Sequence, residues 1–235
     1  MISGLDFPTA AMATPYSLHI FEEVTSTQDV ASGLLTAQPV LVVAHRQSAG
    51  RGRGGDGWLN APRALAASLA VNTQWPPGQR PLIPLVAGLA AASVTRPACR
   101  LKWPNDLLLD DVKVGGLLVE AAGDRVVIGF GLNLYWPEPP PGMGGLHAAD
   151  PGPSVAVDLA QAWSHALLAR LDRGPEGWDH EEYRRLSATI GREVAWEPEG
   201  RGSALAVDDD GALLVATSTG TVRLTAGRVR HLRDL

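Results

Sequence analysis

The sequence predicts an α/β domain followed by a small all-β domain. Up to about residue 173, apolar segments of strand length alternate with segments of helical periodicity. From about residue 189, short β-prone segments are separated by turn signals such as Asp209-Asp210-Gly211. Residues 137–153 hold six prolines and four glycines, too many for regular structure, and are expected to form a loop or linker.

The first domain is predicted element by element. Residues 17–24 alternate as a strand, and residues 25–37 form a short helix whose start has Ser26 and Asp29 in capping-box spacing. The remaining expected elements are strands at 38–45, 64–72 and 100–103, a helix at 81–95, a turn at 104–106, a hairpin of 114–122 with 126–135, and an amphipathic helix at 155–173.

The last part of the chain has a different sequence pattern. Four β-prone segments, at 192–197, 203–208, 212–217 and 221–226, predict a small barrel of about 45 residues. We therefore divide the chain into a first domain, residues 1–188, and a second domain, residues 189–235.

Length and composition are those of an ordinary globular protein. The chain has 235 residues, of which 45% are hydrophobic and 19% charged, so a disordered or fibrous chain is excluded. No apolar run is long enough to span a bilayer, and the first residues lack the features of a secretory signal. Cys99 is the only cysteine, which excludes an intrachain disulfide and disfavours a thiolate zinc site. These features predict a cytoplasmic protein with no membrane partner.

The charges are unevenly used. The net charge of −5 disfavours nucleic acid as a partner, since binding would need a local basic patch. Of the 20 basic residues only Lys102 and Lys113 are lysines, and they lie close together in the sequence. One interpretation is a general bias toward arginine, with two lysines left by chance. The other is that at least one position needs a compact ammonium, as at a reacting phosphate or carboxylate.

A glycine-rich loop with two arginines occupies residues 48–57. Its glycines satisfy the dinucleotide pattern G-x-G-x-x-G, but the loop leads to a second strand instead of opening a hydrophobic helix, which argues against a Rossmann fold. Arg51 and Arg53 among five glycines suit an anion clamp, because glycines let the backbone approach an anion and guanidinium groups pair with its oxygens. A solvated loop and an RGG-like RNA-binding segment are the alternatives.

Two further segments concentrate polar chemistry between apolar strands. The first is KWPND at 102–106, followed by Lys113 and a glycine pair where a ligand can approach the backbone. For Lys102 and Trp103, burial and packing are an equal alternative. The second is GFGLN at 129–133, where two glycines weaken a strand unless something comes close. Asn133 is then placed to read a base edge, with a simple bulge as the alternative.

Taken together, these segments resemble the biotin protein ligases. The glycine–arginine loop is similar to that family's GRGRxG segment, KWPND…KxGG followed by LLVE to its second signature, GFGLN to its GxGxN strand, and Ser26-Thr27 to its S-T motif. The match runs in order from about residue 17 to 235. It implies a class II synthetase-like mixed sheet with helices and a C-terminal SH3-like β-barrel. Because only about sixteen residues precede the first strand, the chain resembles the monofunctional form without the N-terminal DNA-binding domain.

The resemblance also implies roles for individual residues. Biotin would be held by Ser26, Thr27, Gln28, Gln47, Arg51, Gly52, Arg53 and Lys113. ATP or the adenylate would be held by Arg53, Trp58, Asp106, Lys113 and Asn133, with Trp58 stacked on adenine, Asn133 at its edge, and Asp106 orienting the charged cluster or a magnesium ion. Lys113, Arg53 and Arg51 would be catalytic. Gln28 stands where the family commonly has Asn, and Gly54 where it often has a basic or polar residue.

The activity that the resemblance implies has two steps. Biotin's carboxylate attacks the α-phosphorus of Mg²⁺·ATP to give biotinyl-5′-AMP and pyrophosphate. A lysine of the biotin carboxyl carrier domain of an acyl-CoA or pyruvate carboxylase then attacks the mixed anhydride. A homodimer is compatible with the activity that the resemblance implies.

Three other functions stay open at this point. A lipoate or octanoate ligase or transferase has the same fold and carrier chemistry. A nicotinamide-dependent oxidoreductase rests on the G-x-G-x-x-G pattern alone, and an RNA-binding module rests on the RG repeats.

Overall fold

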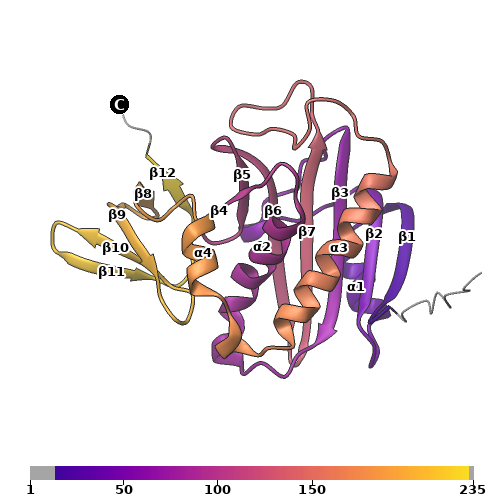
Figure 1. The fold of residues 1–235 in the computed structure, drawn as a ribbon, viewed down its shortest axis with the longest axis horizontal. Helices are drawn as coiled ribbons and strands as arrows, with labels where there is room; N and C mark the ends of the chain where they lie inside the picture. The colour runs from indigo at the N-terminus through magenta and orange to yellow at the C-terminus, as the bar shows by residue number, and fades with distance from the viewer. Residues whose placement is uncertain (1–13, 233–235) are drawn as a thin grey trace, which may run out of the picture.

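The computed structural model describes residues 14–232, and its larger part is a seven-stranded mixed sheet with the order β1-β2-β3-β7-β6-β5-β4 (Figure 1). β1 and β2 are parallel, whereas every other neighbouring pair in this sheet is antiparallel. The strands are β1 (Ser17–Val24), β2 (Val40–Gln47), β3 (Arg63–Asn72), β4 (Arg100–Lys102), β5 (Asp106–Leu109), β6 (Val112–Ala122) and β7 (Arg125–Tyr135).

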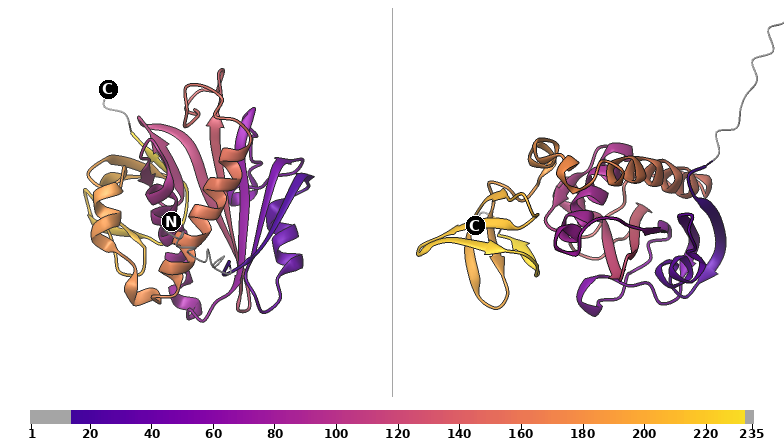
Figure 2. Two further views of the ribbon diagram at one scale, coloured as in Figure 1. Left: turned by 45° about the vertical axis from the view of Figure 1, so that its right-hand side comes forward. Right: turned by 90° about the horizontal axis from the view of Figure 1, so that it is seen from below.

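Helices cover both faces of this sheet, as Figure 2 shows from below. α2 (Ile83–Val94) and α3 (Ser154–Leu171) lie on one face, and α1 (Thr27–Leu34) lies on the other. The residues of β2 alternate between the two sides: Leu41 and Val43 belong to the main core, whereas Val40 and Val42 pack with α1. The near-continuous apolar run of β2 therefore reflects burial on both faces.

The C-terminal part is a second, five-stranded antiparallel sheet with the order β11-β10-β9-β8-β12. Its strands are β8 (Glu193–Trp196), β9 (Gly200–Val207), β10 (Leu213–Thr217), β11 (Gly220–Leu224) and β12 (Val229–His231). We call residues 189–232 the C-terminal module. α4 (His180–Leu186) connects it to the rest of the chain (Figure 1).

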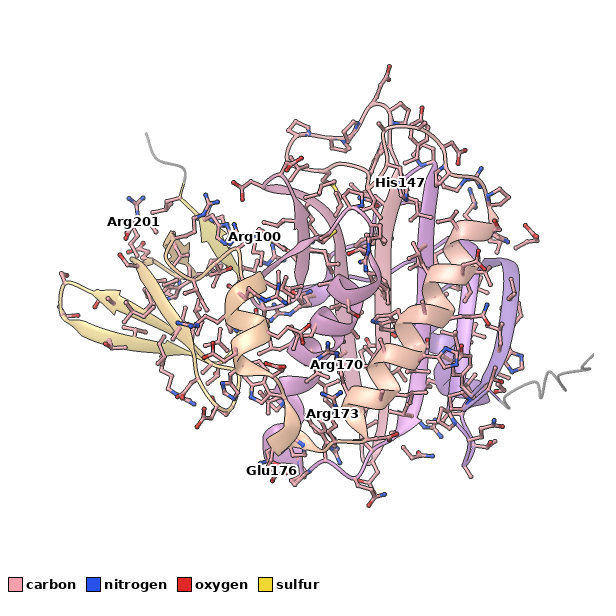
Figure 3. The ribbon with its side chains drawn as sticks, viewed as in Figure 1. Arg100, His147, Arg170, Arg173, Glu176 and Arg201 are labelled. Atoms are coloured by element: carbon pink, nitrogen blue, oxygen red, sulfur yellow. The ribbon has the colours of Figure 1, made fainter. Side chains whose placement is uncertain are left out.

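The C-terminal module is joined to the larger part through the KWPND turn. The backbone N–H of Trp103 donates to Thr189 Oγ1 at 2.9 Å, and its indole N–H donates to the carbonyl of Gly211 at 2.9 Å. Arg100, labelled in Figure 3, donates to the carbonyl of Ser187, which lies just before the module. Buried residues on both sides belong to one core. The burial of Trp103 is thus explained by packing against the module. Because the two parts share one core, a domain boundary at residue 188 stays a proposal.

Most predicted elements are confirmed with small shifts at their ends. The first helix is shorter than expected, and the second is preceded by a 3₁₀ segment, Pro77–Leu82. The prediction of a capping box at the first helix is wrong, because the Ser26 side chain makes no cap hydrogen bond. α4, β5 and β12 were not expected.

Residues 14–232 contain no helix whose length and apolarity would let it cross a membrane. The expectation about the segment before the first strand falls mainly on residues 1–13, outside the described residues.

Candidate active site

A cavity of about 590 Å³ opens between the glycine–arginine loop, the start of α1, the KWPND turn and strands β6 and β7. The C-terminal module closes part of its wall with Arg228 and Arg230. Ten of the eleven predicted site residues line it: Ser26, Thr27, Gln28, Gln47, Arg51, Gly52, Arg53, Trp58, Asp106 and Lys113. Segments far apart in the sequence therefore meet in one place.

One end of the cavity is a network of uncharged polar groups. Gln47 Oε1 accepts from the backbone N–H of Thr27 at 2.8 Å and from its hydroxyl at 3.0 Å. The Thr27 hydroxyl also lies 2.8 Å from Ser68 Oγ, and since its proton is given to Gln47, Ser68 is the donor in this pair. Ser68 is a site residue that the sequence analysis missed. Its signal is a buried hydroxyl in the otherwise apolar middle of β3.

Three buried polar atoms of this lining have no hydrogen-bond partner among the described residues. They are Ser26 Oγ, Gln28 Oε1 and the indole nitrogen of Trp58. A buried polar group without a partner costs about 1–3 kcal/mol, so such atoms gathered at one cavity indicate a polar ligand.

The glycine–arginine loop folds back on itself as a narrow turn. The backbone of Arg51 pairs with Gly57, and positive φ angles at Gly54 (67°) and Gly55 (84°) make the reversal. The Arg51 guanidinium donates to both carboxylate oxygens of Asp29, at 2.8 and 2.9 Å, and to Glu120 at 2.9 Å. Asp29 therefore anchors the loop instead of capping α1.

Arg53 reaches the opposite side of the loop. Its guanidinium donates to Asn105 Oδ1 at 3.2 Å and to the carbonyl of Gly227 at 3.4 Å. Burial lowers the pKa of Arg53, with Asp106 opposing and Arg228 adding to that effect. The side chain is thus a partly desolvated cation at the cavity, poised for an anion.

Both lysines of the chain pair with the same carboxylate. Lys113 Nζ lies 2.7 Å from Asp106 Oδ1, and Lys102 Nζ lies 3.4 Å from Asp106 Oδ2. Formal charges leave one positive charge over, with both ammonium groups at the cavity. This cluster favours the interpretation that the two lysines are kept because the site needs compact ammonium groups.

The two glycines in β7 are close to other side chains, as predicted, but these belong to the protein. A Cβ at Gly131 would lie 2.6–2.8 Å from ring atoms of Trp58, and one at Gly129 would lie 3.0 Å from Gln28 Oε1. Trp58 and Gln28 therefore need glycine where they cross the strand.

Asn133 is the predicted site residue that does not line the cavity. It is fully buried, and its side-chain N–H₂ donates to the carbonyl of Gly144 at 3.1 Å, holding the loop at 137–153 against β7. Its Oδ1 has no partner among the described residues. The role of Asn133 toward adenine stays a prediction.

Comparisons with known proteins agree with this geometry. The profile of the Biotin/lipoate A/B protein ligase family matches residues 20–133, and that of the Biotin protein ligase C terminal domain matches residues 189–232. The chain is 34% identical over 220 residues to a biotin–[acetyl-CoA-carboxylase] ligase of Mycobacterium tuberculosis, covering 83% of this chain and 79% of that protein.

Solved structures show the same fold. The biotin protein ligase of Aquifex aeolicus, solved with biotin and ATP, has a TM-score of 0.75 at 23% identity, with 93% of this chain and 99% of that chain covered. The Leishmania major enzyme in complex with biotinyl-5-AMP has a TM-score of 0.56 at 24% identity, with 93% and 99% covered. With the sequence relative above, the matches in both parts of the chain establish that it belongs to the biotin protein ligase family.

Proposed function

We propose that this chain is an ATP-dependent biotin ligase that forms biotinyl-5′-AMP and transfers biotin to a lysine of a biotin carboxyl carrier domain. The observation that carries the proposal is one cavity with unsatisfied uncharged polar atoms at Ser26 and Gln28 and a cationic cluster at Lys102 and Lys113. Biotin has the same two kinds of group. Its ureido ring donates and accepts hydrogen bonds, and its valerate chain ends in a carboxylate that suits the cationic cluster. The relatives' names and the ligands of the two solved structures support the same substrates.

The cationic cluster suits the first step. A carboxylate must approach a triphosphate, and two anions repel each other unless positive charge lies between them. Lys113 is assigned to the biotin carboxylate and then to the phosphoryl oxygens. Asp106 holds Lys113 and Lys102 in place without cancelling their joint charge. Neither step needs a nucleophile from the protein, so the protein's work is positioning and charge stabilisation.

Trp58 and the loop are assigned to the nucleotide. The Trp58 ring, held against Gly131, offers a face for adenine. The loop carrying Arg51 and Arg53 would cover the adenylate and exclude water, which would otherwise hydrolyse the anhydride.

Magnesium, which the resemblance implies as a partner of ATP, would enter with the phosphates. No three His, Cys, Asp or Glu side chains within residues 14–232 gather as a metal site, and the Asp106 carboxylate is engaged by two lysines. When bound, the ion would neutralise phosphate charge.

The test is to incubate the protein with biotin, ATP and Mg²⁺ and to measure pyrophosphate release, the mass of biotinyl-adenylate, and label on a carrier domain with its lysine intact or replaced by arginine. Pyrophosphate release and labelling of the intact carrier alone are expected. No adenylate with biotin would reject the proposal.

Lipoate or octanoate is the second candidate substrate, because the matched family profile includes lipoate ligases. Running both acids in the same assay separates the two. The nicotinamide hypothesis loses its support, since the loop contains only a short 3₁₀ turn, Arg53–Gly55, and is followed by β3 rather than by an α-helix. The RNA hypothesis is weakened because Arg51 and Arg53 already contact protein groups.

A further inference from the structure

Gln28 has a partner that the proposed function does not use. Its side-chain N–H₂ donates to Glu120 Oε2 at 3.1 Å and lies 3.5 Å from the carbonyl of Leu118. Glu120 is part of β6, does not line the cavity, and has a side chain that is 45% exposed. Any effect it has on a ligand must therefore pass through a neighbour.

These contacts allow one orientation of the Gln28 amide. The carboxylate of Glu120 and the carbonyl of Leu118 are both acceptors, so the amide nitrogen must face them. The reversed amide would bring its oxygen against a carboxylate oxygen, with loss of the hydrogen bond and electrostatic repulsion. Glu120 thus fixes Oε1 on the opposite side.

On that side the amide oxygen is left without a partner. Gln28 Oε1 is buried next to Gly129, where a Cβ would lie 3.0 Å from it, and both residues line the cavity. The neighbouring Ser26 Oγ is also unpartnered among the described residues. A fixed, unsatisfied acceptor favours a ligand that brings an N–H group and penalises one that cannot donate.

We propose that Glu120 is a positioning residue that holds Gln28 as an acceptor and so makes the site select a cyclic urea over a ring without N–H groups. The proposal rests on the proposed function, because it concerns the biotin end of the same cavity. A dithiolane ring such as that of lipoate has no N–H donor and would leave Gln28 Oε1 unpaired.

Glu120 has a second contact that must be separated from the first. It also accepts from Arg51 at 2.9 Å. Asp29 binds that same guanidinium through both carboxylate oxygens, and its carboxylate forms no hydrogen bond with the Gln28 side chain in the described structure. Asp29→Asn is therefore a matched control, since it weakens the hold on Arg51 and leaves the Gln28 amide alone.

The experiment measures pyrophosphate release against biotin and lipoate concentration for wild type, Glu120→Ala, Asp29→Asn, Gln28→Met and the Glu120→Ala/Gln28→Met double variant. Glu120→Ala is expected to raise KM for biotin about tenfold with kcat within about twofold. Its preference for biotin over lipoate should fall by a similar factor. The double variant should match Gln28→Met alone, because Glu120 then has no amide left to orient.

Two results would overturn the inference. One is an Asp29→Asn variant with the same rise in KM, which would assign the effect to Arg51. The other is additive effects in the double variant. Glu120→Gln, which can still accept from Gln28, should recover most of the wild-type KM, and it keeps the test valid if Glu120→Ala folds poorly. A wild-type protein inactive with biotin would reject the proposed function itself, a result distinct from either of these.

Discussion

Arg228 of the C-terminal module and Asp56 of the glycine–arginine loop form an ion pair, with Nη2 and Oδ1 2.8 Å apart across 172 positions of sequence. The same guanidinium lies 3.4 Å from where a Cβ would sit at Gly54. Gly54 of the loop is therefore in the immediate neighbourhood of Arg228. Arg228 and its neighbour Arg230 both line the cavity.

Breaking this pair should change how the loop retains its ligand while leaving stability nearly constant. Both side chains are more than half exposed, so the pair contributes at most about 1 kcal/mol to folding. We expect Arg228→Ala and Asp56→Asn to shift the thermal midpoint little but to increase escape of biotinyl-AMP, measured as biotin on an added bystander protein. The double variant should resemble either single variant. Bystander labelling at the wild-type level in both would contradict a role for the pair.

Gly131 provides a test of the proposed nucleotide face. A Gly131→Ala side chain would collide with Trp58, which must then leave its position. Since stacking on an aromatic ring is worth about 1–3 kcal/mol per base, we expect KM for ATP to rise about tenfold with KM for biotin much less affected.

Gly33→Ala is the control, because nothing lies within 4 Å of its Cβ position and it lies within α1. That substitution should leave both KM values unchanged and increase the free energy of unfolding by about 0.5–1 kcal/mol. An unchanged KM for ATP in Gly131→Ala would argue that adenine does not use Trp58.

The sequence predicted well those elements whose information is carried by a local pattern. The apolar run of β2, the hairpin of β6 with β7 and the glycine–arginine loop each have their own signal within one continuous stretch of sequence. α4 lacks an apolar stripe, because its polar sequence HEEYRRL buries only Tyr183, and its local signal is limited to the cap at Asp179, which accepts from the backbone N–H of Glu182. Its place is set by tertiary contacts, including the ion pair of Arg170 on α3 with Glu182 at 2.9 Å.

The candidate site shows the same division. Residues in compact motifs, such as Lys113 and Arg53, could be named from the sequence alone. Glu120 could not, because it acts through Gln28, 92 positions away. Ser68 has only the weak signal of a hydroxyl in an otherwise apolar strand, since its partner Thr27 lies 41 positions away. Asn133 was named from a motif but faces the loop at 137–153, a contact that no local pattern encodes.

His231 predicts a pH dependence of stability. Burial, and secondarily the charges of Lys102 and Arg192, lower its pKa from 6.5 to about 4. The unfolded chain therefore takes up a proton at a higher pH than the folded one, so stability is fully present above about pH 6.5 and falls as the pH drops toward 4. The urea midpoint should accordingly be lower at pH 5 than at pH 7.

His231→Gln is the matched variant, since an amide can keep the 3.0 Å contact with Thr189 Oγ1 without titrating. It should lose most of the difference between pH 7 and pH 5. The same difference in wild type and variant would show that another group is responsible.

Lys113→Ala and Arg53→Gly are expected to fail in different ways. Lys113 is proposed to contact the reacting carboxylate and phosphate, and its removal leaves Asp106 paired with Lys102 alone. The loss of a charge-assisted hydrogen bond costs about 1.5–3 kcal/mol, which is about ten- to over a hundredfold in rate. Adenylate formation, measured as pyrophosphate release, should therefore collapse in Lys113→Ala.

Arg53→Gly removes the two contacts that tie the loop to Asn105 and Gly227 and adds backbone freedom, but it leaves the Thr27–Gln47 network untouched. The variant should still form adenylate and hold it poorly, so released biotinyl-AMP should label lysines of an added protein that carries no carrier domain. Lys113→Ala should show no such label, because it makes too little adenylate to release. Bystander labelling as low in Arg53→Gly as in wild type, with adenylate formation intact, would mean that the loop does not retain the intermediate.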